Sequence, residues 1–327
     1  MNKKRIEWGH QKRTRNIVTR TRVSQNSEED SAASFFVASD EEENIMKRTV
    51  LKNKAMNVIL TASLVTSGFV FAPAAVKADD SKVLRVGMEC GNPPYNWSQT
   101  DDSNGAVQVE GSTEYVNGYD IKMAQSIAES MGCELEVYKI EWNGLIMALQ
   151  SDKIDAIIAG MSPTEERKQS VDFTDPYYTA DYVTLVKADS EYADAASVED
   201  LKGAKVTSQQ GTKMYDTLEQ IPDADIQEAL PDMASVVVAL TSDRIDATIM
   251  EKPMALAATA TNKDLKMLTF EEDGDYDVDD SITSISIAVR KGDTERLDAM
   301  NEALADISEE TRSEWMDEAI SNQPASN

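Results

Sequence analysis

The chain has 327 residues, enough for two domains, and 41% of them are hydrophobic, which is enough to build real cores. Its formal net charge of −27 argues against nucleic acid or an anionic membrane surface as a partner, and is typical of a well-solvated surface. The single histidine, His10, lies in a front segment that we expect to be removed. We therefore expect no metal, no cofactor and no histidine-dependent catalysis.

The front of the chain differs in composition from the rest. Residues 1–45 are polar, with charged clusters and no helical or strand period, so we expect a disordered segment or a misassigned start. Residues 46–78 predict a secretory signal peptide, with a basic start, an apolar run and small residues before a cut after Ala78. A membrane anchor is the alternative, although the run is short for a span. The mature protein would begin near Asp79 and be exported, periplasmic or extracellular and associated with the cell surface.

Export permits a disulfide between the two cysteines of the chain. Cys90 follows a strand predicted over 84–88, and Cys133 begins the next strand, predicted over 133–140. In a parallel sheet these positions lie at opposite ends of the strands, too far apart to bridge. We therefore expect two free thiols.

An internal repeat links two stretches that align without gaps, residues 145–160 (LIMALQSDKIDAIIAG) and residues 236–251 (VVVALTSDRIDATIME). Each copy is typical of a helix end, a polar turn and a strand, which predicts two α/β lobes of one design. Gly160 and Glu251 take the same place in the two copies. Both follow a strand, at the edge where open α/β sheets bind ligands.

The stretch 154–178 carries the strongest signal of a binding site. A β-branched strand leads to small residues, including Gly160, which let a ligand approach the backbone. Ser-Pro-Thr-Glu at 162–165 combines three helix-start signals, with Ser162 as the expected N-cap. One turn in lies Arg167, whose guanidinium can grip a carboxylate through two parallel hydrogen bonds. These features predict a carboxylate seat, and an ordinary strand–turn–helix with a surface arginine is the alternative.

The remaining elements complete two lobes. Residues 100–116 are expected to be a polar surface excursion, and Gln209 to Thr212 a turn into a helix that Thr212 caps. Further strands are predicted over 181–187, 205–208 and 284–290, and further helices over 121–131, 198–201 and from 293 onward. The strands near 181 and 283 cross between the lobes, as a hinge requires.

From Leu84 to about Ala319 the chain resembles the polar-amino-acid substrate-binding proteins of ABC importers, extracellular solute-binding protein family 3. The matching motifs, in order, are RVGMECGNPPYNW, GYDIKMAQSIAE, EWNGLIMAL, DKIDAIIAGMSPTEERKQSVDFTDPYY, LKGAKVTSQQGT, DRIDATIMEKP and SIAVRKGD. The resemblance implies an α/β, two-lobed, periplasmic-binding-protein-like (type II) fold with a two-strand hinge. Lobe 1 would comprise 79–180 plus 283–327, and lobe 2 would comprise 181–282.

The resemblance also implies a ligand site between the lobes. Arg167, in the T-E-x-R motif, would pair with the ligand carboxylate, and Glu251 would hold the α-amino group. We expect both side chains to face a solvent-filled open cleft. The implied ligand-binding residues are Glu89, Asn92, Tyr95, Trp142, Gly160, Ser162, Arg167, Gly211, Thr212 and Glu251.

The same comparison suggests how a ligand side chain would be recognised. Tyr95 and Trp142 would flank it. Asn92 replaces an aromatic residue common in the lysine/arginine/ornithine- and histidine-binding members, so one stacking wall is absent. Glu89 takes the acidic position in the loop that follows the strand predicted over 84–88. It favours a ligand with a cationic or hydrogen-bonding side chain, although it could equally bind backbone.

We interpret the chain as a monomeric extracytoplasmic solute-binding protein, not an enzyme. It would capture a free amino acid with a polar or cationic side chain and deliver it to the membrane permease of an ABC transporter. Two alternatives stay open. One is an extracytoplasmic dehydratase on the same fold, with Glu89 or Glu251 as general acid. The other is a ligand sensor, which the absence of a membrane span after the lobes disfavours.

Overall fold

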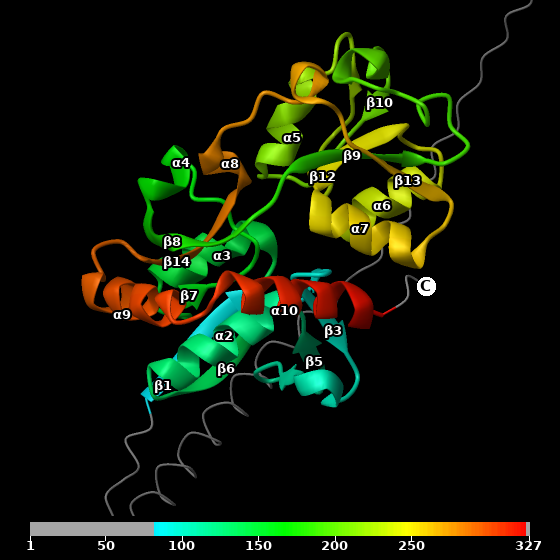
Figure 1. Ribbon diagram of the computed structural model, residues 1–327. Helices are drawn as coiled ribbons and strands as arrows, with labels where there is room; N and C mark the ends of the chain where they lie inside the picture. Colours follow the sequence, from blue (N-terminus) through cyan, green and yellow to red (C-terminus); the bar gives the residue numbers. More distant parts are fainter. Residues whose placement is uncertain (1–81, 325–327) are drawn as a thin grey trace, which may run out of the picture. The chain divides into compact units, whose positions relative to one another are not determined.

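Two five-stranded sheets organise residues 82–324, the part of the chain that this computed structural model describes (Figure 1). The predictions for residues 1–45, for the signal peptide over 46–78 and for a mature start near Asp79 all lie outside the described residues. Each large sheet forms the centre of one lobe, and most of its strands alternate with helices along the chain.

The first sheet has the strand order β6-β1-β7-β14-β8. β1 pairs in parallel with β6 and β7, whereas β14 runs antiparallel to β7 and β8. The interior of β14 is wholly buried, as its apolar sequence SISIAVR predicts. The strands are β1 (Lys82–Met88), β6 (Cys133–Lys139), β7 (Ala156–Ile157), β8 (Val171–Thr179) and β14 (Ser284–Arg290).

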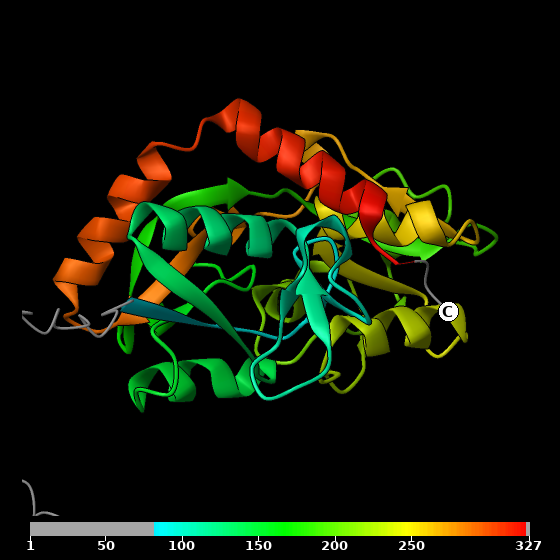
Figure 2. The same cartoon turned by 90° about the horizontal axis from the view of Figure 1, so that it is seen from below.

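Helices cover both faces of this sheet (Figure 2). α2 packs on β6 and α9 packs on β8, while α3 packs on β1, β7 and β14. The helices of this lobe are α2 (Tyr119–Ser130), α3 (Leu145–Gln150), α4 (Glu165–Lys168), α8 (Asp280–Thr283), α9 (Thr294–Ala305) and α10 (Glu309–Asn322), with a short 3₁₀ turn, η2 (Trp142–Gly144), before α3.

The second sheet has the strand order β11-β10-β12-β9-β13. Every residue of β12 is buried, and the helices α5, α6 and α7 pack against it. The strands are β9 (Tyr182–Lys187), β10 (Lys205–Val206), β11 (Asp225–Ile226), β12 (Ala247–Glu251) and β13 (Leu265–Leu268). The helices are α5 (Lys213–Thr217), α6 (Met233–Thr241) and α7 (Lys252–Thr261), with 3₁₀ turns η3 (Val198–Leu201), η4 (Leu218–Gln220) and η5 (Glu272–Gly274).

Two adjacent segments carry the chain between the sheets. The first joins β8 to β9, and the second runs from η5 through α8 to β14. They are bonded to each other, because the Ala180 N–H donates to the Thr283 carbonyl at 2.9 Å and Thr179 pairs with Ser284. The last helix, α10, also reaches the second lobe, where Gln323 donates to the Ala257 carbonyl at 3.0 Å (Figure 2).

The internal repeat has a common backbone geometry in both lobes. Asp152 and Asp243 take the corresponding turn position with left-handed φ values of 61° and 58°. Three residues later, Asp155 and Asp246 each donate a backbone N–H to a carbonyl of a neighbouring strand, and each side chain accepts the backbone N–H of that same strand residue. The alignment of the two sequences therefore reflects the same helix–turn–strand unit.

A small third sheet corrects one expectation. Part of the segment 100–116, expected to be a surface excursion, pairs in a four-stranded sheet of order β2-β3-β5-β4. Its strands are β2 (Gly91–Asn92), β3 (Asn96–Gln99), β4 (Val107–Gln108) and β5 (Tyr115–Asn117), with the turn η1 (Ser103–Gly105). Val109 and Val116 are buried there, so a few apolar residues in a polar stretch were enough to form strands.

Cys90 and Cys133 are free thiols, as expected. Cys133 pairs with Lys82 at the start of β1, whereas Cys90 lies beyond the other end of that strand. Burial raises the pKa of the Cys90 thiol to about 12, which makes it unreactive at neutral pH.

Candidate functional site

A narrow cavity of about 20 Å³ lies between the two lobes, at the carboxyl ends of β7 and β12. Both lobes contribute to its wall. Its lining residues are Asn92, Trp142, Gly160, Ser162, Arg167, Tyr182, Gln209, Thr212, Lys213, Met214, Glu251 and Met254.

Arg167 enters this cavity from the short helix α4. Its Nη1 donates to the Ser162 carbonyl at 2.8 Å, and its Nη2 donates to the Gly211 carbonyl of the other lobe at 3.0 Å. The guanidinium also stacks on Trp142, with Cζ 5.2 Å from the ring centroid. Burial lowers the pKa of Arg167 from its ordinary value, but an arginine stays charged. Within residues 82–324 its half-buried guanidinium forms no ion pair with a carboxylate.

Glu251 lies at the end of β12 and is 5% exposed. Burial raises the pKa of its carboxyl to about 7. Tyr95 and Arg167 favour the charged form and partly offset this rise in the pKa. Among the described residues it too has no ion-pair partner. The expectation of an open, solvent-filled cleft is therefore wrong for this structure, because the lobes are closed over Glu251.

A buried hydrogen-bond chain supports the floor of the cavity at Gly160. The Gly160 N–H donates to the Tyr177 hydroxyl at 3.1 Å, and that hydroxyl donates to Asp120 at 2.7 Å. Gly160 has φ +64°, and an added Cβ would lie 3.4 Å from the Tyr95 ring. A glycine suits this position because the backbone is left-handed and packs closely on an aromatic ring.

The helix start near Arg167 differs from the prediction. Thr164, not Ser162, is the N-cap of α4, and its hydroxyl accepts from the Arg167 N–H at 3.3 Å. The Ser162 hydroxyl instead donates to the Ile282 carbonyl at 2.9 Å. Thr164 has an extended backbone, so α4 begins at Glu165, two residues later than a cap at Ser162 would give. Arg167 is therefore the third residue of the helix.

In the second lobe the predicted turn and cap are present. Thr212 caps α5 by accepting from the Tyr215 N–H, while its hydroxyl donates to the Gln209 carbonyl at 2.7 Å. Gly211 has φ +70°, and its carbonyl accepts from both Arg167 and Trp142. The G-T turn thus presents one carbonyl oxygen to two side chains of the opposite lobe.

Three of the sequence-implied residues lie beside the cavity rather than in its wall: Glu89, Tyr95 and Gly211. Tyr95 is completely buried behind Gly160. Glu89 accepts from Gln209 Nε2 at 2.8 Å, a bond that joins the two lobes. Burial raises the pKa of Glu89 to about 7, and its acidic neighbours Asp232 and Glu141 raise it further.

Five lining residues were not expected from the sequence: Tyr182, Gln209, Lys213, Met214 and Met254. Gln209 and Lys213 flank the predicted Gly211-Thr212 turn, so their position next to that turn was the available signal. Nothing in the local pattern distinguishes Tyr182 or Met254 from ordinary core residues. Lys213 directs its ammonium to Asp216 at 2.7 Å.

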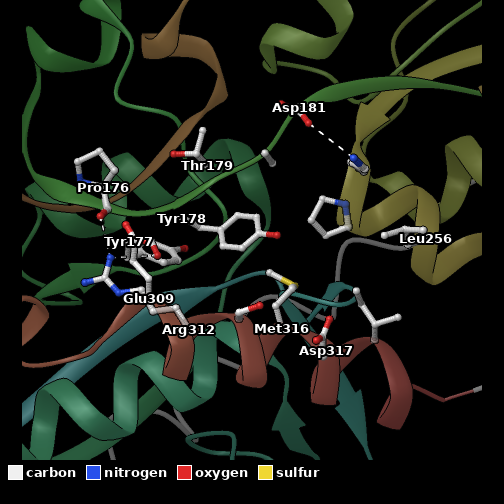
Figure 3. Close-up of a pocket in the computed structure, with 15 residues that line it drawn as sticks. Pro176, Tyr177, Tyr178, Thr179, Asp181, Leu256, Glu309, Arg312, Met316 and Asp317 are labelled. Atoms are coloured by element: carbon white, nitrogen blue, oxygen red, sulfur yellow. Dashed lines mark hydrogen bonds and ion pairs between the residues drawn. The ribbon is translucent and has the colours of Figure 1, made fainter. Parts of the chain in front are cut away.

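A larger cavity, of about 630 Å³, lies on the hinge side between β8, α7 and α10 (Figure 3). Its two cationic side chains, Lys252 and Arg312, already have partners. Asp181 pairs with Lys252 at 3.8 Å, and Arg312 donates to four backbone carbonyls, those of Pro176, Tyr177, Leu304 and Ile307. The inter-lobe cavity is the better candidate site, because both lobes line it and its two opposite charges, Arg167 and Glu251, form no ion pair within residues 82–324.

Two further observations bear on the site. In the described range no cluster of three or more histidine, cysteine, aspartate or glutamate side chains is arranged to bind a metal ion. Likewise, none of the helices between residues 82 and 324 has the length and apolar character that a membrane crossing needs.

The fold and this cavity agree with the family that the sequence matches. Residues 84–319 match the bacterial extracellular solute-binding proteins, family 3, and the chain belongs to this family. The predicted resemblance and the α/β, two-lobed type II fold with its two-strand hinge are thereby confirmed.

Individual relatives bind amino acids. The chain is 30% identical over 254 residues to the arginine-binding extracellular protein ArtP of Bacillus subtilis, covering 76% of this chain and 91% of the relative. It is 34% identical over 203 residues to a probable histidine-binding protein of Campylobacter jejuni, covering 62% and 72%. Its fold is similar to an amino acid ABC transporter substrate-binding protein from Streptococcus pneumoniae bound to L-arginine, with TM-score 0.63, 27% identity and coverage of 73% and 93%.

Proposed function

We propose that this protein captures a free amino acid between its lobes and delivers it to the membrane permease of an ABC transporter. The observation that carries the proposal is the pair Arg167 and Glu251. Both line one buried cavity, they have opposite charges, and neither forms an ion pair among residues 82–324. A buried charge is costly unless it is paired, so the cavity suits a ligand with one negative and one positive group.

In this proposal Arg167 binds the α-carboxylate and Glu251 binds the α-ammonium. The two charges come from different lobes, so a zwitterion is held by both only when the lobes are closed. Trp142, 9% exposed, packs along the guanidinium and lines the same cavity, which suits contact with the ligand side chain. The hinge segments at Ala180 and Thr283 would let the lobes separate to admit the ligand.

The proposal extends to the setting of the protein. The relatives are binding proteins, and one is named as part of an amino acid ABC transporter. We infer that this chain binds without catalysing a reaction, acts as an exported monomer associated with the cell surface, and does not bind nucleic acid. The lobe limits 79–180 plus 283–327 and 181–282 belong to the same proposal.

A thermal-shift screen of the 20 common amino acids, followed by calorimetric titration and chemical analysis of the recovered ligand, tests the proposal. We expect saturable 1:1 binding of at least one amino acid, recovered unchanged. An extracytoplasmic dehydratase would instead return a chemically altered ligand, with turnover that is lost in Glu89→Gln or Glu251→Gln. Absence of binding to every amino acid would contradict the proposal.

A further inference from the structure

Two short segments of the second lobe separate the inter-lobe cavity from the hinge-side cavity of Figure 3. In the first segment, Tyr182 lines the inter-lobe cavity and its neighbour Asp181 lines the hinge-side cavity. In the second, Glu251 lines the inter-lobe cavity, and Lys252 and Pro253 line the hinge-side cavity. The segments are bonded to each other, because Tyr182 pairs with Glu251 and the Lys252 N–H donates to the Asp181 carbonyl at 2.9 Å. The two cavities therefore lie on opposite sides of one wall.

The hinge lies along this wall. Ala180 bonds Thr283 across the two crossing segments and Thr179 pairs with Ser284, so an axis of lobe rotation runs close to these residues. Thr179 and Ala180 also line the hinge-side cavity. A rotation about such an axis that opens one cavity narrows the other. In this structure the inter-lobe cavity is narrow, about 20 Å³, and the hinge-side cavity is wide, about 630 Å³.

One side of the hinge-side cavity is helix α10, which is fixed to the first lobe. Arg312 donates to the Pro176 and Tyr177 carbonyls of β8, at 3.2 and 3.4 Å. Further along the helix, Glu318 pairs with Lys122 of α2 at 2.7 Å. When the lobes rotate, α10 therefore moves with the first lobe.

The facing side of the cavity is helix α7 of the second lobe. Leu256, 38% exposed, lines the cavity from α7, and Ser313 and Met316 line it from α10 (Figure 3). The two helices are bonded at the end of α10, where Gln323 donates to the Ala257 carbonyl at 3.0 Å. Next to that contact the cavity keeps α7 and α10 apart, which leaves α7 room to move when the second lobe turns.

We propose that the hinge-side cavity regulates amino acid binding, because α7 moves into it when the lobes open. A group that fills the cavity then opposes opening and raises the affinity of the site without touching the ligand. This inference rests on the proposed function. The physical reason is that a filler fits the closed arrangement and clashes in the open one, so it shifts the population towards the closed form. A larger closed fraction gives a tighter apparent dissociation constant.

Side chains added to the two sides of the cavity test this directly. Leu256→Trp fills it from α7 and Ser313→Trp fills it from α10, while Leu256→Ala enlarges it. Ser321→Trp is the matched control, since Ser321 is an exposed serine of α10 that does not line the cavity. None of these three residues lines the inter-lobe cavity, so each variant leaves the proposed ligand contacts in place.

Calorimetric titration measures the affinity for each of the 20 common amino acids that stabilises the wild type in the thermal-shift screen. We expect Leu256→Trp and Ser313→Trp each to bind about three- to tenfold more tightly than wild type, and Leu256→Ala to bind more weakly. Ser321→Trp should match the wild type.

Hydrogen–deuterium exchange of the ligand-free proteins measures closure separately. The turn 209–214 reports on it, because the Gly211 carbonyl in this turn accepts from Arg167 of the other lobe. Amides of the turn should exchange more slowly in both tryptophan variants of the cavity than in wild type or Ser321→Trp.

Unchanged affinity in folded Leu256→Trp and Ser313→Trp would contradict the inference and leave the proposed function intact. Weaker binding would overturn it too, because the cavity would then widen when the lobes open. If the wild type binds no amino acid, the proposed function fails, whereas the exchange rates still decide whether a filled cavity closes the lobes. Circular dichroism checks each fold. Either tryptophan variant decides the question if the other does not fold, and Leu256→Ala, which adds no bulk, serves if neither does.

Discussion

Asp155 and Asp246 take the same place in the two lobes, and each accepts a hydrogen bond from a backbone N–H of a neighbouring strand, Arg85 at 3.1 Å and Lys205 at 2.8 Å. Their surroundings differ. Burial pushes the pKa of Asp155 up, but hydrogen bonds from Arg85 and Arg290 outweigh it and hold the pKa at about 2. Asp246, half-buried, has no ion-pair partner among residues 82–324.

Asparagine at these two positions should therefore have unequal effects. Asp155→Asn removes the buried carboxylate that binds the half-buried Arg85 and Arg290, and should cost about 1.5–3 kcal/mol of unfolding free energy. Asp246→Asn loses one backbone bond and should cost about 0.5–1.5 kcal/mol. Urea unfolding of the two variants measures the difference. Equal losses would show that the arginine contacts of Asp155 contribute little to stability.

Gly118 should tolerate no side chain. At φ +129°, an added Cβ would lie 2.2 Å from the Tyr95 carbonyl oxygen, which is backbone and cannot move aside easily. Gly118→Ala should therefore destabilise the protein by more than about 3 kcal/mol, with loss of the α2 start. Gly111→Ala is the control, since it has φ +70° with open space around it and should cost only about 1–2 kcal/mol. Thermal unfolding compares the two, and similar melting temperatures would refute the steric argument.

The sequence predicted those parts of the fold that depend on local pattern. The repeat identified both helix–turn–strand units, and the strand over 284–290 and the Thr212 cap are present as expected. The position of the N-cap at Thr164 was missed, because Ser-Pro-Thr-Glu offers two hydroxyl caps and tertiary contacts choose between them.

The candidate site was predictable where residues follow strand ends or turns, as Arg167 and Glu251 do. Gln209 was missed because its importance comes from a partner 120 residues away, Glu89, which no local pattern reveals. The burial of Glu251 was missed for the same reason, since it depends on closure of the other lobe over the end of its strand.

Three buried carboxyls should make stability depend on pH. Burial raises the pKa of Glu89 and Glu251 to about 7 and that of Asp120 to about 6, from ordinary values near 4. The folded state thus holds protons more tightly than the unfolded chain, and the resulting stability is lost as pH rises through 6 and 7. Each pKa unit corresponds to about 1.4 kcal/mol.

The ligand-free protein should therefore melt at a higher temperature at pH 5 than at pH 8. The double variant Glu89→Gln and Glu251→Gln should melt higher than wild type at pH 8 and show a smaller pH effect. Glu134→Gln, at an exposed position of β6, serves as control and should behave like wild type. Differential scanning calorimetry measures all of them, and a wild-type melting temperature that rises from pH 5 to pH 8 would contradict the assignment.

Ligand binding should release protons near neutral pH. With a pKa of about 7, the Glu251 carboxyl is partly protonated at pH 6.5 and must ionise to bind an ammonium group. Calorimetric titrations at pH 6.5, in buffers with different ionisation enthalpies, should show release of a fraction of a proton, which falls towards zero at pH 8.5. Glu251→Gln should reduce this release, and an unchanged release would assign the proton to another group.

The central claim is that Arg167 and Glu251 are the two poles of a zwitterion site, and titration calorimetry of the wild type and its variants tests it most directly. Arg167→Ala and Glu251→Gln should each lose about 2–5 kcal/mol of binding free energy, or roughly tens- to thousands-fold in affinity, for whichever amino acid the wild type binds. Arg167→Lys should also bind more weakly, because an ammonium lacks the two-pronged contact. Lys168→Ala, on the same short helix and paired with Glu165 at the surface, should bind as the wild type does. If Arg167→Ala and Glu251→Gln fold and bind the amino acid as tightly as wild type, the site lies elsewhere.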